Sequence, residues 1–559
     1  MRPSASTPPT VAEAIVDELS RAGVTRVFII PGVHNMPLWW ALGEAGIDRV
    51  LVRHEQTAMY AADGYFRATG KLGVCITTSG PGAANTAGAT GEALTSGSAV
   101  LHISTTPHLS LKSSQPGVRR GSLHEIPDQA SIFTALVKSV SVVERAGHAG
   151  TQVRIAIKDA LRPQAGPVYV ELPTDLLGAV VPEDSIAASE YVPVKPRLRL
   201  PEAAVEALSS SRKPIIWAGA GSIGARVADL AEHLAAPVVS TMMARSTMDA
   251  RNPLAVVAPP QEQAVADLLN SADLVIALGT DFDGQTTQNW RLSISPPLLR
   301  VDVDETQLTL NAIPDFPVRA TVSSFIESVL EVIPPASDER RASAEAAAKA
   351  TSAAIANRLR EDGEEAAAAN VVAALNRTLP SHVPVVADMT LMGYWASGYL
   401  ERSQPRTFMF PMGWGTLGFA LPASVGVAHG SGQPTVVVVG DAGFLFAVGD
   451  LASLVERNLP VKVIVFNDEA YKMLEQGVPA DRSREGLTGL CTPDFVTLAQ
   501  AFGMRSQRAT LETLGTAIEA ELLLPGPALI EVPNVTKPPV TTSARWPLAG
   551  DRVRQTVHP

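Results

Sequence analysis

The sequence predicts an α/β protein with three doubly wound parallel-sheet domains. Short apolar runs rich in valine and isoleucine, such as residues 436–439 and 461–466, alternate with longer stretches of helical spacing. Such short runs are typical of strands buried on both faces of a parallel sheet, and the helices between them are crossover connections. The alternation occurs in three separate sections of the chain, which predicts one sheet for each section.

Two segments without buried runs divide these sections. Residues 183–200 are polar and punctuated by proline, and residues 336–369 are rich in alanine and charge. We expect a linker at the first and a linker helix on the surface at the second. The predicted organisation is a first domain over 1–182, a linker over 183–200, a middle domain over 201–335, a linker helix over 336–369, a last domain over 370–540 and a tail over 541–559.

Composition narrows the class of protein. The chain has 559 residues, of which 46% are hydrophobic and 18% charged, so it can bury several cores. Its net charge of −11 argues against a nucleic-acid or anionic-membrane partner. No stretch approaches the roughly 20 apolar residues of a membrane span, and no signal peptide is evident, so we expect a cytoplasmic protein. Two cysteines, Cys75 and Cys491, cannot form a disulfide framework or a zinc site between them.

In the first section, polar residues follow the predicted strands. Thr10 is expected to cap a helix. Pro31 closes the next strand and His34 follows it, while Glu55 lies at the exit of the strand over 49–52, in RHEQTA. Parallel strands end at one edge of a sheet, so these residues should lie near one another. We expect a poorly hydrated Glu55 carboxyl; the alternative is a first-turn carboxylate stabilised by the helix dipole.

A glycine-rich turn, SGPGAAN at residues 79–85, follows the strand over 73–78 and ends at Asn85. Glycine permits a tight turn before a helix, although a nucleotide-binding loop would have the same composition. His124 lies in a polar loop, GSLHEIPDQ, before the next strand. A histidine there can transfer protons near neutral pH, whereas most isolated histidines are structural or exposed.

The middle section contains AGAGSIG, residues 218–224, between a strand and a helix. A glycine-rich turn at this place is typical of a dinucleotide-binding loop. However, the acidic ribose partner expected about twenty residues further on is absent, since that region contains VVSTMMARS. We therefore expect the middle domain to be a scaffold.

In the last section, residues 436–439, a helix over 444–457 and residues 461–466 form a predicted βαβ unit. Asp441 and Asp468 follow the two strands, 468 − 441 = 27 positions apart, and should meet at one edge of the sheet. Hard oxygen ligands beside a glycine-containing loop that opens a helix suit a magnesium ion carrying a diphosphate. The alternative is two turn aspartates of no special role.

Four motifs, in this order, resemble those of thiamine-diphosphate-dependent enzymes, in the acetolactate synthase-like and benzaldehyde lyase-like branch. RHEQTA resembles the motif of the activating glutamate, and SGPGAAN resembles the corresponding turn of acetolactate synthases. GTLG, residues 415–418, resembles the segment under the cofactor, and GDAG…ND resembles the diphosphate-binding motif. The family usually has glycine where Ala442 stands and often asparagine where Asp468 stands, and neither departure removes an oxygen ligand.

The resemblance implies a ligand set. Mg²⁺ would be held by Asp441, Asp468 and the main-chain carbonyl of Ala470. The residues implied to bind thiamine diphosphate are Pro31, Asn85, Thr390, Gly415, Leu417, Gly440, Asp441, Ala442 and Gly443.

It also implies catalytic roles. Glu55 would activate the pyrimidine ring of the cofactor, and Leu417 would force the two cofactor rings into a bent conformation. For Leu417, an ordinary core leucine is the alternative. His34, in a turn similar to that of benzaldehyde lyase, and His124 would face the substrate and transfer protons.

The implied function is formation or cleavage of a carbon–carbon bond on a 2-oxo acid through an enamine, as in an acetolactate synthase-like carboligase. A 2-oxo acid decarboxylase and an acyloin or 2-hydroxyacyl lyase are alternatives, and a non-catalytic cofactor-binding homologue is a remote one. In this family the glutamate domain of one subunit faces the diphosphate domain of another, which implies a homodimer or homotetramer.

Acetolactate synthases bind flavin in the domain equivalent to the middle section. Here Asp281 and Gly284 replace the basic residues expected near a flavin diphosphate. We therefore expect no FAD.

Overall fold

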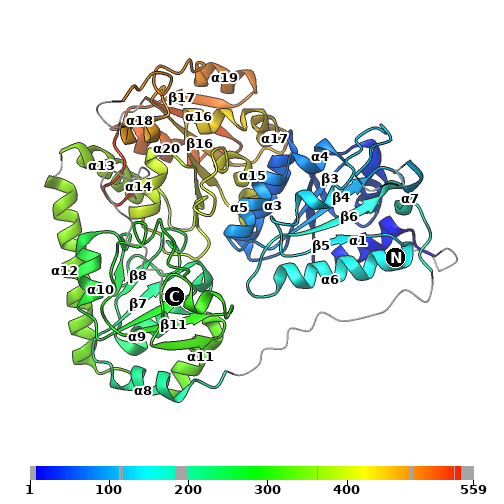
Figure 1. The fold of residues 1–559 in the computed structure, drawn as a ribbon. Helices are drawn as coiled ribbons and strands as arrows, with labels where there is room; N and C mark the ends of the chain where they lie inside the picture. The colour runs from blue at the N-terminus through cyan, green and yellow to red at the C-terminus, as the bar shows by residue number, and fades with distance from the viewer. Residues whose placement is uncertain are drawn as a thin grey trace.

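A computed structural model describes residues 8–111, 115, 117–182, 198–361, 363–478, 482–533 and 536–542. These parts of the chain form three six-stranded sheets, each flanked by helices, and every ladder between neighbouring strands is parallel (Figure 1). The predicted fold class is therefore confirmed. Residues 183–197 of the predicted linker and 543–559 of the predicted tail lie outside the described residues.

The first sheet has the strand order β2-β1-β3-β4-β6-β5. Its strands are β1 (Arg26–Ile29), β2 (Asp48–Leu51), β3 (Gly73–Thr77), β4 (Val100–Thr106), β5 (Val140–Val142) and β6 (Val168–Pro173). Its helices are α1 (Val11–Arg21), α2 (Met36–Glu44), α3 (Glu55–Thr69), α4 (Pro81–Ala84), α5 (Ala87–Thr95), α6 (Ala149–Leu161) and α7 (Thr174–Leu177). Thr10 caps α1 as predicted, because its hydroxyl accepts from the Glu13 N–H at 3.3 Å.

The second sheet has the strand order β12-β11-β10-β7-β8-β9. Its strands are β7 (Pro214–Ala218), β8 (Val238–Ser240), β9 (Ala255–Val256), β10 (Leu274–Leu278), β11 (Leu298–Asp302) and β12 (Phe316–Arg319). The helices here are α8 (Glu202–Ser210), α9 (Val227–Leu234), α10 (Gln263–Asn270) and α11 (Val322–Val332). The long helix α12 (Asp338–Glu361) runs along this domain and leads to α13 (Gly363–Thr378) beside the last domain (Figure 1).

The third sheet has the strand order β14-β13-β15-β16-β18-β17. Its strands are β13 (Val385–Ala387), β14 (Phe408–Met409), β15 (Thr435–Gly440), β16 (Val461–Asn467), β17 (Arg505–Arg508) and β18 (Ala528–Pro533). Its helices are α14 (Leu391–Tyr399), α15 (Ala420–Ser431), α16 (Asp441–Leu445), α17 (Leu451–Glu456), α18 (Lys472–Gly477), α19 (Phe495–Ala501) and α20 (Leu514–Leu522).

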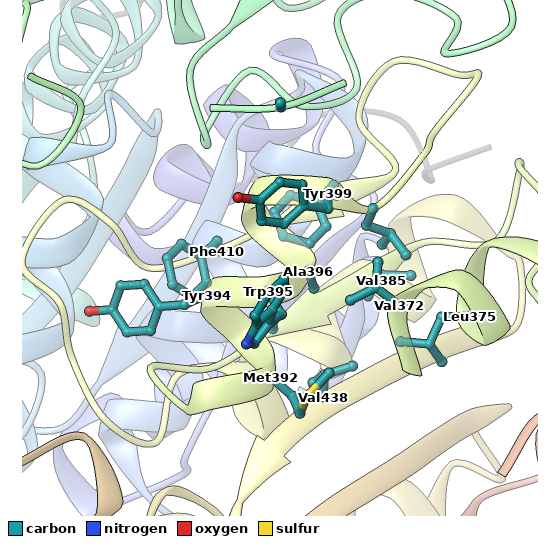
Figure 2. Close-up of a cluster of buried hydrophobic side chains, with 14 of the residues drawn as sticks. Val372, Leu375, Val385, Met392, Tyr394, Trp395, Ala396, Tyr399, Phe410 and Val438 are labelled. Atoms are coloured by element: carbon teal, nitrogen blue, oxygen red, sulfur yellow. The ribbon is translucent and has the colours of Figure 1, made fainter. Parts of the chain in front are cut away.

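Buried side chains around Trp395 join α13 and α14 to this sheet (Figure 2). The same apolar cluster continues into the middle domain through residues such as Trp217 and Phe282. Among the described residues, no helix is both long enough and apolar enough to cross a membrane.

The single helix predicted over 444–457 is wrong, because the structure has two helices there. α16 begins at Asp441, and α17 begins ten residues later, at Leu451, after an intervening 3₁₀ turn. The turn places Asp450 inside the protein, where its carboxylate accepts from the Arg53 N–H at 3.0 Å and from the Thr57 hydroxyl. These partners come from the first domain, so the break is a tertiary effect that local periodicity does not contain.

The first and last domains meet where α3 crosses α15. A Cβ added to Gly64 would overlap the carbonyl oxygen of Ala423, and one added to Gly426 would overlap that of Ala61. The two helix backbones are therefore in direct contact, and only glycine fits at these positions. The apolar side chains around the crossing form one core that the two domains share.

We expect Gly426→Ala to lower the free energy of unfolding by about 1–3 kcal/mol, because the added methyl group pushes the two helices apart in a packed core. Chemical denaturation and the melting temperature measure this. Gly178→Ala is the matched control, since a Cβ at Gly178 meets no described atom within 4 Å and its φ is −88°. Equal stability of the two variants would contradict the close crossing.

Candidate active site

Two carboxylates of the last domain meet at the carboxyl edge of its sheet, as predicted. β15 and β16 pair in parallel with Gly440 opposite Phe466, so Asp441 and Asp468 emerge side by side. Asp441 is 2% exposed, and burial raises its pKa. Burial and the charge of Asp441 raise the pKa of Asp468 to about 7, while the Lys472 ammonium opposes this rise. Both shifts indicate negative charges that a bound cation would stabilise.

The oxygen atoms here fit a divalent cation. Asp441 Oδ1 accepts from the Ala442 N–H at 2.7 Å, whereas Asp441 Oδ2 is buried and has no hydrogen-bond partner among the described residues. A buried carboxylate oxygen without a partner is costly, and coordination by a hard cation removes that cost. Glu469 has a left-handed φ of 52°, which bends the chain between Asp468 and Ala470. The described residues hold no group of three or more His, Cys, Asp or Glu side chains suited to a metal. Main-chain and phosphate oxygens would therefore be the remaining ligands of the cation.

The loop that follows β15 packs against the end of β13. A Cβ added to Gly440 would lie 2.8 Å from Thr390 Oγ1, and one added to Gly443 would lie 3.2 Å from Asp388 Oδ1. Thr390 and the loop over 440–443 are thus neighbours, as expected for residues that share one ligand. A cavity of about 360 Å³ opens beside Ala442.

Asp388 is a site residue that the sequence analysis missed. It is 1% exposed, and its carboxylate accepts from the main-chain N–H groups of Gly418 at 3.1 Å and Ala420 at 2.8 Å. Burial raises the pKa of Asp388 to about 6, although these hydrogen bonds favour the ionised form. The carboxylate thereby holds the segment that contains Leu417. Its position directly after a buried strand, like that of Asp441, is the signal that could have identified it.

Leu417 and Gly415 lie in this segment as half-buried residues. Gly415 and Gly418 both have left-handed φ values, of 70° and 77°. The segment is therefore a tight turn, and Leu417 within it is half-buried rather than part of a closed core.

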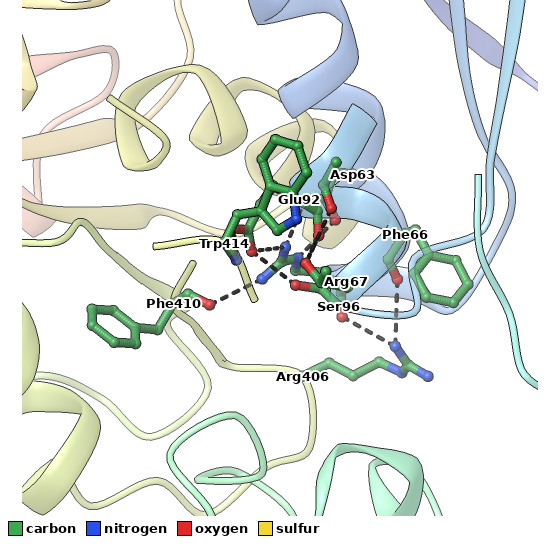
Figure 3. A network of polar contacts seen from close by, with 10 residues as sticks. Asp63, Phe66, Arg67, Glu92, Ser96, Arg406, Phe410 and Trp414 are labelled. Carbon is green, nitrogen blue, oxygen red and sulfur yellow. Dashed lines mark hydrogen bonds and ion pairs between the residues drawn. The ribbon is translucent and has the colours of Figure 1, made fainter. Parts of the chain in front are cut away.

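A buried ion cluster ties the start of the same segment to the first domain (Figure 3). Arg67 on α3 pairs with Asp63 at 2.7 Å and with Glu92 at 3.0 Å, and it also donates to the carbonyl oxygen of Phe410. Glu92 Oε2 in turn accepts from the Trp414 N–H at 2.9 Å. A buried cation between two carboxylates is costly to break, so the cluster fixes where this segment begins.

Glu55 lies at the carboxyl edge of the first sheet. It is the first residue of α3, and its Oε2 accepts from Asn85 Nδ2 at 2.9 Å. A Cβ added to Gly82 would lie 3.6 Å from Glu55 Oε1, so the glycine-rich turn lies against this carboxylate. Glu55 is only half-buried, so one chain by itself does not provide the poorly hydrated environment expected from the sequence.

The two histidines lie together at the same edge. Pro31 is exposed just after β1, and His34 follows it in a short 3₁₀ turn. The rings of His34 and His124 are 5.5 Å apart between centroids and nearly perpendicular. Ser79, which the sequence analysis did not single out, is hydrogen-bonded to both rings. Burial and the charge of His124 lower the pKa of His34.

Glu55 faces away from the last domain of its own chain. The opposite face of α3 carries Thr57, which bonds Asp450, and Tyr60, whose ring packs on Phe419 with centroids 5.4 Å apart. At 3.6 residues per turn, these residues lie about 200° and 140° around the helix from Glu55. Figure 1 shows α4, which leads to Asn85, on the far side of α3 from the last domain. The halves of the candidate site that hold Glu55 and Asp441 therefore do not face each other within one chain.

A second cavity, of about 800 Å³, lies between the carboxyl edge of the middle sheet and segments of the first and last domains, including the cations Arg67 and Arg406. Its lining includes Asp281, Asp283 and Asp302, and burial raises the pKa of both Asp281 and Asp302. Asp302 is the last residue of β11, so it reaches this cavity from a strand that lies far along the chain from the AGAGSIG turn.

Three family models match the chain, one for each domain. They are described as the N-terminal TPP binding domain, the central domain and the C-terminal TPP binding domain of the thiamine pyrophosphate enzyme, over residues 9–132, 201–329 and 388–532.

Individual relatives match over nearly their full lengths. "Probable 2-ketoarginine decarboxylase" of Pseudomonas aeruginosa is 33% identical over 537 residues, which cover 94% of each chain. The acetolactate synthase large subunit of Parasynechococcus marenigrum is 30% identical, over 94% of this chain and 88% of the relative. The structure of a thiamine diphosphate-dependent 4-hydroxybenzoylformate decarboxylase from Rhodococcus jostii RHA1 shares the fold. Its TM-score is 0.78 at 24% identity, over 95% of this chain and 100% of that one.

We expect Asp388→Asn to destabilise the protein by about 1–3 kcal/mol, because an amide NH₂ would replace an acceptor opposite buried N–H donors. Affinity for thiamine diphosphate should fall about tenfold, since the Leu417 segment loosens. Thermal unfolding and calorimetric titration measure the two effects. Asp267→Asn, at an exposed position on α10, is the control and should change stability by less than about 0.5 kcal/mol. Unchanged cofactor affinity in Asp388→Asn would remove this residue from the site.

Proposed function

The chain belongs to the thiamine pyrophosphate enzyme family, and from that premise we propose that it decarboxylates a 2-oxo acid with thiamine diphosphate and Mg²⁺. The observation that carries the proposal is the pair of imidazoles, His34 and His124, at the sheet edge that also holds Glu55. Release of an aldehyde needs a proton at the carbon that has lost carbon dioxide. Histidine is the side chain that donates and accepts protons near neutral pH. Two of the similar proteins are named as decarboxylases.

In this proposal the cofactor is held mainly by the last domain. Asp441, Asp468 and the Ala470 carbonyl bind Mg²⁺, and the main chain over 440–443 binds the diphosphate with help from the Thr390 hydroxyl. Bound thiamine diphosphate supplies the electron sink for cleavage of the carbon–carbon bond.

Other residues bind and orient the two rings of the cofactor. Leu417, on its tight turn, supports the bent conformation, and Gly415 offers its carbonyl oxygen to the aminopyrimidine. Glu55, oriented by the amide of Asn85, holds a proton against the pyrimidine ring. Pro31 lies at the same edge as Glu55.

Carboligation, the outcome that the sequence favours, is the second candidate. It is supported by the acetolactate synthase relative, which matches 94% of this chain. The two functions differ in what the reacting carbon takes up, which is a proton in decarboxylation and a second carbonyl compound in carboligation. Cleavage of an acyloin is the reverse of the second function and remains an outcome to be tested.

The cavity beside Ala442 suggests which substrate side chains fit. Among the described residues, the side chains that line it are all uncharged: Ala442, Leu445, Phe446, Tyr471, Leu490, Cys491 and Thr492. Such a lining favours an apolar or aromatic side chain over a cationic one, because a cation would lose its hydration without a compensating charge.

We also propose that the active assembly contains at least two copies of the chain, as a homodimer or a homotetramer. The orientation of Glu55 away from its own last domain supports this, because a second copy can bring Asp441 opposite Glu55. Exposed apolar side chains flank both halves of the site: Val33 and Leu123 beside the histidines, and Phe446 beside Ala442. Clusters of this kind are typical of protein interfaces.

Flavin is absent in this proposal. Three carboxylates line the middle cavity, those of Asp281, Asp283 and Asp302, and they outnumber its two cations, Arg67 and Arg406. The charge of Arg67 is already paired with Asp63 and Glu92, so the lining as a whole would repel the diphosphate of FAD. A purified protein with the visible absorbance of flavin would contradict this.

We expect Glu55→Gln and Asp441→Ala each to be nearly inactive by itself. Glu55→Gln should keep cofactor affinity and lose turnover by orders of magnitude, whereas Asp441→Ala should weaken the binding of Mg²⁺ and thiamine diphosphate together. Binding titrations and steady-state kinetics separate the two defects. Near-normal turnover in Glu55→Gln would contradict the role of Glu55.

Co-expression of these two variants tests whether sites are shared between copies. About half of randomly formed dimers contain one chain of each kind, and one of the two sites in such a dimer is intact. Activity should therefore return to about a quarter of that of the unmodified protein. If each site lay within one chain, mixed dimers would stay as inactive as the separate variants.

The reaction itself is tested with a panel of 2-oxo acids, thiamine diphosphate and Mg²⁺, in which carbon dioxide is measured and products are identified by mass spectrometry. The panel contains pyruvate, 2-ketoarginine and 4-hydroxybenzoylformate. We expect an aldehyde from the aromatic acid, at a higher kcat/KM than from 2-ketoarginine. A coupled acyloin or acetohydroxy acid would favour carboligation. Preference for 2-ketoarginine would contradict the argument from the uncharged cavity.

A further inference from the structure

Ser79 lies between the two imidazoles of the first domain. Its side chain is fully buried, and its hydroxyl is hydrogen-bonded to His34 Nδ1 and lies 3.5 Å from His124 Nδ1. Both histidines contact the serine with the same ring nitrogen, so their Nε2 atoms are left for other partners. One hydroxyl thus connects two groups that can each carry a proton.

The loop that carries His124 is fastened to the turn that carries Ser79. His124 has a left-handed φ of 61°, which is rare for a residue with a side chain. Gly80, with a φ of 62°, lies under this loop, and a Cβ there would be 2.5 Å from the carbonyl oxygen of His124. The Gly80 N–H donates at 2.7 Å to Gln129 Oε1 at the other end of the loop.

The far end of this loop is also fixed. Gln129 is buried, and its Nε2 donates to the Thr105 carbonyl at 3.0 Å and to the Tyr169 hydroxyl at 2.8 Å. An unusual backbone conformation that persists between fixed ends is typical of functional sites, where it aims a side chain. Here the fixed ends hold His124 beside Ser79.

The strand order determines the spatial order of these residues along the carboxyl edge of the sheet. β2 leads to Glu55, β1 to His34, β3 to Ser79, and β4 to the loop with His124. His34 is therefore next to the strand of the candidate catalytic glutamate, and His124 is at the far end of the row.

A serine hydroxyl can donate one hydrogen bond while it accepts another. With both imidazoles neutral, the bridge is complete when His124 Nδ1–H donates to Ser79 Oγ and the hydroxyl donates to the lone pair of His34 Nδ1. If the Ser79 proton moves to His34 Nδ1 and the His124 proton moves to Ser79 Oγ, the serine is restored. One proton has then passed from His124 to His34.

We propose that Ser79 is a proton-relay residue that connects His34 to His124. The proposal rests on the function proposed above, in which His34 gives its Nε2 proton to the carbon that has lost carbon dioxide. The proton lost at His34 Nε2 is then replaced at His34 Nδ1 through Ser79, and His124 takes up a proton from water at Nε2. Every side chain ends neutral, each ring is in its other tautomer, and the water is left as hydroxide. The starting tautomers return when His34 Nε2 takes a proton from water, the bridge runs in reverse and His124 Nε2 gives its proton to hydroxide. The net change is one proton transferred from water to product, with one hydroxide released.

The first arm of the test needs neither cofactor nor substrate. ¹⁵N NMR of histidine-labelled protein, above the pH at which the imidazoles are protonated, reports which ring nitrogen carries hydrogen. His34→Gln and His124→Gln assign the signals. We expect His124 to carry its hydrogen on Nδ1, which is the less common tautomer of free imidazole. In Ser79→Ala it should return to the Nε2–H tautomer.

Ser98→Ala is the matched control, because Ser98 is a fully buried serine of the same domain whose hydroxyl has no hydrogen-bond partner in the described part of the chain. This variant should leave both histidine tautomers unchanged. If His124 carries its hydrogen on Nε2 in the unmodified protein, or if Ser79→Ala changes neither ring, the bridge is wrong whether or not the protein is a decarboxylase.

The second arm measures turnover on whichever acid is decarboxylated. We expect Ser79→Ala to lower kcat about 10²-fold with little change in KM, at the low end of what a positioned proton donor contributes. The dependence of rate on the fraction of heavy water should curve in the unmodified protein and in Ser98→Ala, because several protons move together. It should become linear in Ser79→Ala. A tautomer change with unaltered kcat and curvature would show a bridge that relays nothing, and would overturn the proposal.

Discussion

Direct contact between the backbones of α3 and α15 fixes how the first and last domains of one chain meet. Gly64 and Gly426 allow this approach, and the shared core around them leaves no room for another arrangement. The contact decides which face of α3 turns inward. Thr57 and Tyr60 contact the last domain of the same chain, so Glu55 lies on the outer face of α3.

Buried charged side chains hold the segment over 410–420 in place between the domains. Arg67 between Asp63 and Glu92 fixes one end of the segment over 410–420, and Asp388 fixes the other through main-chain N–H groups. In both places the hydrogen bonds compensate for the loss of hydration, so the charges determine geometry more than they add stability. Asp441 differs, because one of its oxygens has no such partner within the described residues and is left for a ligand.

Much of this arrangement follows from the order of strands in the sequence. Asp441 and Asp468 could be predicted to meet because parallel strands end at one edge, and the same rule brought His34 to the edge of Glu55. Asp388 and Ser79 also follow buried strands, but their contacts could not be predicted, since their partners lie 30 and 45 positions away in segments without a fixed spacing. The break between α16 and α17 depends on Arg53, which is 397 positions from Asp450. Local periodicity has no access to such contacts.

The cavity beside Ala442 lends itself to protein engineering. Its walls include Leu445 and Tyr471, which are 37% and 36% exposed, whereas the residues that fasten the site are buried. Exposed side chains tolerate replacement better than core residues do. A mutant library restricted to these two positions would therefore sample new shapes for this cavity while leaving the α3–α15 crossing and the buried ion cluster intact. The exposed walls of the cavity can therefore be varied, while the buried residues that hold the site are kept unchanged.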